Sequence, residues 1–448
     1  MSAVISPAPH VSGVKTAADA LLQPMRYTSR AYRRMTLLLL MVIGWAMFCF
    51  IYQAMVGLGV TGLRRPVFWG FFITDFVFWI GISHAGTLIS AILRLTNATW
   101  RYPVTRAAEA ITVFALMIGG LFPMVHLGRP WFFYWLAPYP TERMIWPNFR
   151  SPLEWDFFAI STYLTASTLY LYLPMLPDLA LARDRSRGWR HRLYRFLSMS
   201  WQGTQVQWRR LELAIQLMAA VVIGIAVSVH TIVSWDFAMS VVPSWHSTIF
   251  GPYFVAGAIF SGIAALIVIM AILRRVYHLE AYLQPKHFSN LGKLLLTMTL
   301  LWGYFVTAEM ITTWYGNLPD EMGTFWSKVS GHYAWLFWTM VLCNFIIPFP
   351  LLAIRKLRTI GGTVIASCTI LVGMWLERFI IVVPGAASQR LSFNRWYGYY
   401  PHWTEISISL ATLCAMTLLY MLFTKVFPII SIWELGATKH SAPAAVEE

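Results

Sequence analysis

The sequence predicts an all-α polytopic membrane protein with about ten transmembrane helices. Hydrophobic residues make up 58% of the 448 residues and charged residues only 12%, which lies outside the usual balance of soluble domains. The hydrophobic residues also occur in blocks of about 20, the length at which a helix crosses a bilayer. Because backbone polar groups in lipid must be satisfied within the spanning structure, blocks this long indicate helices.

In chain order, the first element is a polar tail over residues 1–34, which we expect to be mobile and which ends in several arginines. A membrane domain over 35–428 follows, and a polar C-terminal tail occupies 429–448. Ten apolar blocks lie within the membrane domain, and each is long enough to span a bilayer. We place these blocks at 35–60, 66–93, 107–127, 153–177, 211–234, 249–273, 294–316, 332–354, 360–383 and 404–428.

A short internal sequence repeat indicates how the helices are grouped. The second block ends Ser90-Ala-Ile-Leu-Arg94 and the sixth ends Met270-Ala-Ile-Leu-Arg274, and both blocks run in the same direction. Two parallel four-helix bundles fit this pattern, one over 66–234 (helices 2–5) and one over 249–383 (helices 6–9). Helices 1 and 10 would then be peripheral.

The basic residues predict the orientation in the membrane. Of the 34 lysines and arginines, 25 fall on the side of the two termini and eight on the other, with Arg378 inside a span. This bias predicts cytoplasmic termini. The net charge of +15 is therefore a topology signal, and we do not expect nucleic-acid binding. The basic, aromatic segment 179–208 is typical of a helix lying on the inner membrane surface against anionic lipid.

The four cysteines argue against a metal cofactor held by this chain. Each lies inside an apolar block, and none forms a CxxC or CxxCH pair. We therefore expect no iron–sulfur cluster, covalently attached haem or zinc site within the chain. We expect the cysteines to be small buried hydrophobic residues.

Ionisable residues inside spans are candidates for function because they are costly to place there. A proton relay through residues at different depths is one interpretation, and structural ion pairs are the other. We expect the side chains of Glu377 and Arg378 to point to different faces of their helix, each toward a partner elsewhere. The candidates for the relay are Asp75, His84, Glu109, His230, Glu309 and Arg378.

The strongest candidate site combines His126 and Asp156. His126 ends the third block, and Asp156 lies about one turn into the fourth, where Pro152 suits the first helical turn. A connected antiparallel pair brings these ends to one edge, about 8–10 Å apart between axes. A base and a carboxylate there suit a small redox ligand that releases protons. Hydrogen bonding within a structured loop is the alternative. Arg129 is either an electrostatic partner or exposed to water.

Two other function classes remain open on the residues alone. An ion-coupled secondary transporter would place its site near mid-membrane at broken helices, but paired Gly/Pro interruptions at matching positions are not seen. A haem b membrane anchor would need axial histidines from facing helices at matching depth. His84 falls in the inner half of its block, whereas His126, His230 and His246 fall near outer ends.

Several stretches resemble the NrfD/PsrC family of membrane quinone-interacting subunits, and the likeness is closest to ActC of bacterial alternative complex III. They extend from the second to the sixth block. They are Gly81-Ile-Ser-His-Ala-Gly-Thr-Leu-Ile-Ser90, Arg106-Ala-Ala-Glu109, His126-Leu-Gly-Arg129, Trp146-Pro-Asn-Phe-Arg-Ser-Pro-Leu-Glu-Trp-Asp156, Ser228-Val-His-Thr-Ile-Val-Ser-Trp-Asp236 and Trp245-His-Ser-Thr-Ile-Phe-Gly-Pro-Tyr-Phe254.

The resemblance implies a protein without its own redox cofactor that binds quinol, often menaquinol, near the outer face of a bacterial inner membrane. In that family the residues matching His126 and Asp156 contact the quinol, and Asp236 and Arg395 fall in matching outer regions. Electrons would pass to an extracytoplasmic iron–sulfur subunit (ActB-like) and then to c-type haem subunits. A second NrfD-like subunit (ActF-like) and small membrane subunits would be further partners. Proton translocation is proposed for the family.

Overall fold

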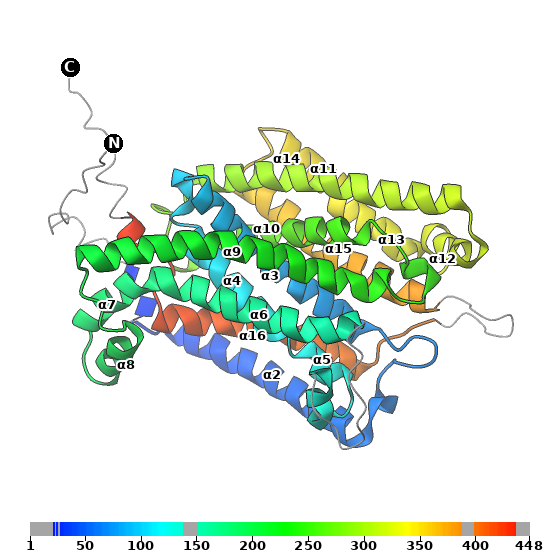
Figure 1. Ribbon diagram of the computed structural model, residues 1–448, viewed down its shortest axis with the longest axis horizontal. Helices are drawn as coiled ribbons and strands as arrows, with labels where there is room; N and C mark the ends of the chain where they lie inside the picture. The colour runs from blue at the N-terminus through cyan, green and yellow to red at the C-terminus, as the bar shows by residue number, and fades with distance from the viewer. Residues whose placement is uncertain (1–20, 23, 26, 138–150, 388–397, 436–448) are drawn as a thin grey trace.

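The computed structural model describes residues 21–22, 24–25, 27–137, 151–387 and 398–435. Long helices running side by side dominate this part of the chain, and no strand longer than an isolated bridge occurs in it (Figure 1). Nine of the described helices are long and apolar enough to cross a membrane. The expected fold class is confirmed. A helix of 21 residues also forms at the fourth expected span, but Glu154, Asp156 and several hydroxyl residues make it more polar.

The first bundle is a ring of four helices in which each contacts its two neighbours. The backbones of α3 and α4 approach closely at Gly86, where a Cβ atom would overlap the Ala108 carbonyl oxygen. Small residues of this kind let membrane helices approach closely. The helices are α3 (Phe71–Leu95), α4 (Thr105–Gly119) with the short α5 (Phe122–His126), α6 (Pro152–Tyr172) and α9 (Gln205–Ala238).

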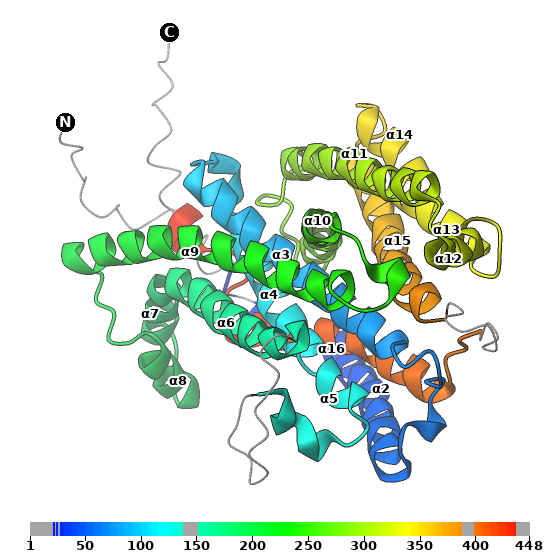
Figure 2. The same cartoon turned by 45° about the vertical axis from the view of Figure 1, so that its right-hand side comes forward.

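The second bundle joins the first along a seam between α3 and α10, and Figure 2 shows α10 lying between α3 and the helices beyond it. Within the second bundle, the eighth of the ten expected spans is interrupted by a π turn over Leu342–Ile346, just before Pro348. The amphipathic α12 caps one end of this bundle. The helices are α10 (Phe250–Val276), α11 (Pro285–Gly316), α12 (Pro319–Val329), α13 (Ala334–Val341), α14 (Pro348–Ala353) and α15 (Ile360–Ala387).

Two outer helices, α2 (Arg30–Val56) and α16 (Trp403–Val426), pair with each other, and α16 also packs on α3 and α4. Side chains link the pair: the Trp45 indole donates to the Ser407 hydroxyl at 3.1 Å. Most large side chains of α2 remain exposed. A face of this composition is suited to lipid or to another membrane helix.

The ends of the long helices form two opposite edges of the molecule. Lys425 at the end of α16 donates to the Pro24 and Tyr27 carbonyls just before α2, so both described ends of the chain meet at one edge. We call the opposite edge, where α2 ends and α16 begins, the distal edge. Helix alternation also brings the end of α5, the start of α6, the end of α9 and the start of α10 to the distal edge (Figure 1).

Three expectations are corrected, two of them at the near edge, the edge where the two described chain ends meet. Segment 179–208 contains two short helices in place of one, α7 (Leu176–Asp184) and α8 (Trp189–Leu197), separated at Gly188, whose φ is +65°. The N-terminal tail is not free up to residue 34, because α2 begins at Arg30 with Ser29 as its N-cap and Leu21, Leu22 and Met25 are buried. Cysteine burial holds for Cys49, whereas Cys368 is exposed.

The C-terminal tail is also anchored over its first residues. Pro428 and Ile430 accept hydrogen bonds from buried Arg106, whose guanidinium pairs with Asp178 at 2.6 Å. Asp178 accepts in turn from the backbone N–H groups of Ile432 and Trp433. Glu434 then bridges Arg94 and Arg101 at 3.1 and 3.0 Å. The residues after α16 therefore form a strap across the near end of the first bundle.

Replacing Arg106 with glutamine should destabilise the protein strongly. The Asp178 carboxylate would stay buried without its counter-charge, and breaking a buried pair costs roughly 3–5 kcal/mol. We expect Arg106→Gln to lower the thermal unfolding midpoint in detergent, and Arg106→Gln with Asp178→Asn to recover part of the loss. The matched control is Arg192→Gln on the exposed face of α8. An equal midpoint in Arg106→Gln and the control would contradict the assignment.

Candidate functional site

His126 is positioned by a break between two helices. α4 ends at Gly119, and the chain restarts as α5, whose Pro123 stands in its first turn. The carbonyl of Val125 accepts a hydrogen bond from Gln53 of α2 at 2.8 Å, and Gln53 is almost fully buried. This contact fixes α5 against the outer helix. The His126 Nδ1 atom is buried and has no hydrogen-bond partner among the described residues.

Gly128 turns the chain immediately after His126. Its φ of +67° lies in the left-handed region, which strongly favours glycine. A Cβ at this position would meet the Leu58 side chain at 2.6 Å. The turn leads into the short helix η3 (Pro130–Leu136), which contacts both α5 and α6. Arg129 within the turn is exposed.

Asp156 and Asp236 form the carboxyl pair of the distal edge. Pro152 begins α6 as expected, and Asp156 follows one turn later, 7% exposed. Asp236 lies in the last turn of α9, 8% exposed, on the helix that packs beside α6. The two carboxyl groups lie close enough to interact directly, and one oxygen of each has no partner among the described residues. The neighbouring Trp155 and Trp235 rings also meet, 6.0 Å apart between centroids.

Two adjacent carboxyl groups repel each other when both are ionised, which favours a proton on one of them. The pair is therefore suited to holding a proton between two helices, and its two unpartnered oxygens are available as acceptors. The backbone brings His126 to the same edge through α5 and η3. Direct contact of a ligand with both His126 and Asp156 remains a prediction. Arg395, the other residue placed here from the sequence, lies outside the described residues.

A second polar cluster lies in the seam between the bundles. The imidazoles of His84 and His230 are fully buried and 4.4 Å apart between centroids. His84 contacts the Ile80 and Ala226 carbonyls at 2.7 Å with its two ring nitrogens, whereas neither nitrogen of His230 has a described partner.

The expectation that His84 and His230 lie at different depths was wrong. α3 begins at Phe71, later than expected, and α9 continues to Ala238, four residues further than expected. At 1.5 Å per residue, these shifts move His84 about 7 Å toward the distal edge and His230 about 6 Å away from it. Errors in helix ends therefore became errors in depth.

The expectation for Glu377 and Arg378 is corrected in part. These neighbours pair with each other at 3.3 Å, although Glu377 also has partners elsewhere. The carboxylate of Glu377 accepts from Tyr253 and Trp302, each at 2.6 Å, and the Arg378 guanidinium stacks 4.7 Å from the Phe254 ring. Sequence reasoning missed Tyr253 and Trp302, because nothing in their local pattern shows which helix they face.

The remaining relay candidates are separate and each has a partner. Asp75 accepts from Trp375 of α15 at 2.7 Å and from Ser409 of α16. Glu109 accepts from Ser90 at 2.5 Å near the other edge, and Glu309 accepts from Ser247 at 2.8 Å. Hydrogen bonds do not join these three carboxylates to one another within the described residues.

Comparison with known proteins identifies the family. The protein family described as "Polysulphide reductase, NrfD" matches residues 59–388. The match covers about three quarters of the chain and includes both bundles. The chain belongs to the NrfD family.

Curated relatives of this NrfD-family chain are membrane components of multi-subunit enzymes. A putative membrane subunit of the dimethyl sulfoxide reductase of Halobacterium salinarum is 28% identical over 371 residues, 80% of this chain and 77% of the relative. The integral membrane subunit of an Hdr-like menaquinol oxidoreductase of Archaeoglobus fulgidus is 23% identical, covering 73% of both chains. The integral membrane subunit of a menaquinone reductase of Nitratidesulfovibrio vulgaris is 22% identical, and the match covers 86% of this chain and 89% of the relative.

The turn after His126 yields a direct test. We expect Gly128→Ala to lower the thermal unfolding midpoint, because alanine is strained at positive φ by about 1 kcal/mol and its methyl group would overlap Leu58. Adding Leu58→Ala should relieve only the overlap and recover part of the loss. Gly224→Ala is the matched control, since a methyl group there meets nothing within 4 Å. A Gly128→Ala protein as stable as the control would exclude this role for the turn.

Proposed function

We propose that this NrfD-family chain is the quinol-oxidising membrane subunit of a quinol:acceptor oxidoreductase of the alternative complex III type. The observation that carries the proposal is the Asp156–Asp236 carboxyl pair at the distal edge. The unpartnered Nδ1 of His126 at the same edge and the relatives named for menaquinol or menaquinone chemistry support it. The substrate proposed is menaquinol or a related quinol.

The chemistry requires the removal of two protons and two electrons from the quinol. In this proposal His126 Nδ1 accepts one hydroxyl proton, and a free carboxylate oxygen of the aspartate pair accepts the other. The two electrons leave to an extracytoplasmic iron–sulfur protein of the same complex and continue to c-type haem subunits. Product quinone then departs into the membrane. Arg129 and Arg395 are proposed to attract or orient the quinol head.

The orientation proposed is a bacterial inner membrane protein with both termini cytoplasmic. The meeting of both described chain ends at one edge agrees with an even number of spans. The excess of basic residues at that edge supports its cytoplasmic assignment. The distal edge then faces the extracytoplasmic side, where an ActB-like iron–sulfur subunit, c-type haem subunits and a second NrfD-like subunit would assemble.

Substitutions at the proton acceptors should slow quinol oxidation in the assembled complex. We expect His126→Ala and Asp156→Asn each to lower the rate about 10²-fold, the scale of one general base. Asp236→Asn keeps a hydrogen-bonding group beside Asp156 but removes a carboxylate, so a smaller loss is expected. The measurement is steady-state quinol:acceptor activity at equal content of redox cofactors.

His332→Ala serves as the control, because His332 is exposed on the loop between α12 and α13. Full activity in both His126→Ala and Asp156→Asn would remove the assignment. Activity lost equally in His332→Ala would indicate damage to assembly.

We also propose that the seam between the bundles transfers protons during turnover. Its participants would be His84, His230 and Arg378, with Asp75, Glu109 and Glu309 nearer the bundle ends. The support is physical: His230 is fully buried with two unpartnered nitrogens, beside a histidine that already contacts two carbonyl oxygens. Buried polar atoms without protein partners are usually hydrated, and water completes proton paths.

Removing the second imidazole should uncouple proton transfer from oxidation. In proteoliposomes, we expect His230→Phe to lower the number of protons translocated per electron at least twofold, with quinol oxidation in the presence of an uncoupler within twofold of wild type. Phenylalanine preserves the packing of the seam while removing both ring nitrogens. An unchanged proton-to-electron ratio would exclude His230 from the path.

A further inference from the structure

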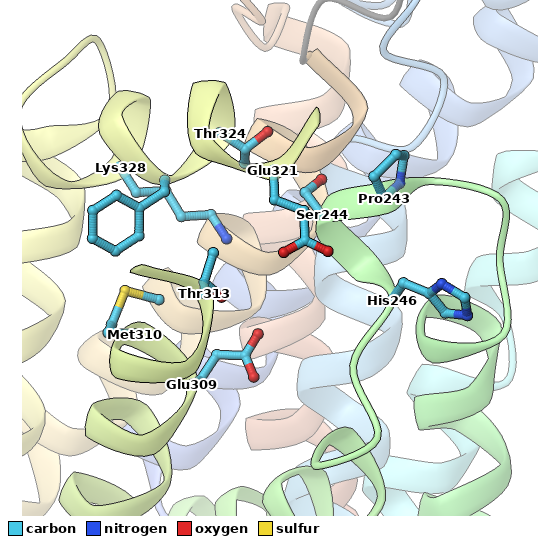
Figure 3. Close-up of a pocket in the computed structure, with 10 residues that line it drawn as sticks. Pro243, Ser244, His246, Glu309, Met310, Thr313, Glu321, Thr324 and Lys328 are labelled. Carbon is cyan, nitrogen blue, oxygen red and sulfur yellow. The ribbon is translucent and has the colours of Figure 1, made fainter. Parts of the chain in front are cut away.

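A small pocket, open to the surface, lies at the distal edge of the second bundle, and its lining does not include the carboxyl pair. It is bounded by η5 (Pro243–Trp245), the last turns of α11 and the amphipathic α12. Figure 3 shows the side chains of Glu309, Glu321 and Lys328 pointing into the same space. The α12 wall therefore presents both signs of charge, and α11 adds a second carboxylate.

These charges are incompletely paired by the described residues. Glu309 accepts one hydrogen bond, from Ser247, while Glu321 and Lys328 make no side-chain hydrogen bond or ion pair with the part of the chain that the structure describes. Burial raises the pKa of Glu321, and the nearby Glu309 carboxylate adds to that effect. Burial lowers the pKa of Lys328, against the attraction of Glu309. Both charges would be stabilised by a ligand of opposite charge.

Two hydroxyl groups in the lining also lack partners. The Thr324 side chain is only 2% exposed, and neither its Oγ1 nor the buried Oγ of Ser244 has a described partner. A hydroxyl can donate to an anionic oxygen or accept from an ammonium. Unpaired buried hydroxyls cost free energy, which a polar ligand or ordered water would remove. Phe325 and Met310 supply the apolar part of the wall.

The surroundings indicate the depth of the pocket. α12 follows directly after the end of α11 and carries Trp326 half-exposed, and three further exposed tryptophans occupy the adjoining helix ends. Tryptophans cluster at the headgroup level of bilayers. They are Trp314, Trp335 and Trp338. A pocket beneath such a belt is reached from the headgroup layer.

We propose that this pocket binds the zwitterionic headgroup of an aminophospholipid such as phosphatidylethanolamine. The primary ammonium would lie between Glu309 and Glu321, and the phosphate would lie at Lys328 with the Ser244 and Thr324 hydroxyls. A purely anionic headgroup would satisfy Lys328 but face two carboxylates, and a purely cationic ligand would face Lys328. The aromatic belt favours a lipid over a free zwitterion of the same chemistry. This site shares Glu309 with the proposed proton path but contains none of the residues proposed to bind quinol.

Lipid binding to the purified complex tests the proposal. Delipidated complex is titrated with phosphatidylethanolamine, phosphatidylglycerol or soluble glycerophosphoethanolamine, and bound lipid is measured by native mass spectrometry. We expect about tenfold tighter binding of phosphatidylethanolamine than of phosphatidylglycerol, the effect of about 1.4 kcal/mol. Glu321→Gln should remove this preference, and Lys328→Met should weaken both lipids about tenfold.

Lys293→Met is the matched control, because Lys293 is an exposed lysine near the other end of α11. Unchanged thermal unfolding midpoints establish that the variants are folded. Glu321→Gln removes one charge without changing size, so it remains informative if Lys328→Met is unstable. Equal binding of the two lipids by the wild type, or identical behaviour of Glu321→Gln and Lys293→Met, would overturn the proposal. Binding of glycerophosphoethanolamine as tight as that of the lipid would overturn the lipid source.

Discussion

The burial of α3 is the constraint on which the rest of the structure depends. This helix contacts α4, α9, α10, α15 and α16, so almost no part of it is available to lipid. Its polar groups, backbone carbonyls included, must therefore be satisfied within the helix or by neighbouring helices. Thr112 donates to the Ser83 carbonyl at 2.6 Å and Tyr163 donates to the same oxygen at 3.1 Å. These interactions specify which helices surround α3 and at what height.

The two edges of the molecule differ in how their buried polar and charged groups are paired. At the near edge, the charged groups Arg106, Asp178 and Glu434 are closed into pairs that hold the C-terminal strap. At the distal edge, buried polar atoms remain without partners among the described residues, including His126 Nδ1 and oxygens of both members of the carboxyl pair. Unpaired buried groups are costly unless a ligand or water satisfies them. The unpartnered carboxyl oxygens and ring nitrogen of the distal edge are groups that a polar ligand would satisfy.

Polar contacts also distinguish the seam between the bundles from the lipid-facing helices. Glu377 is fixed by Tyr253, Trp302 and Arg378, which come from three helices of the second bundle. His84 and His230 lie on the first-bundle side of the seam, where the His230 ring is 6.0 Å from that of Phe254 between centroids, and neither histidine is exposed. Buried polar side chains thus lie on both sides of the interface between the bundles. By contrast, α2 presents large apolar side chains outward and carries few of these polar contacts.

The sequence by itself determined the membrane class and the approximate positions of the long helices, because length and hydropathy are local properties of the chain. It also placed His126 and Asp156 at one edge, since alternating helices fix which ends share a side. Tertiary structure alone decided the contacts: the Asp156–Asp236 pair, the His84–His230 stack and the strap over Arg106 each join residues whose facing depends on helix rotation and depth. A shift of four residues in a helix end moves a side chain by about 6 Å, which is enough to make or break such a contact.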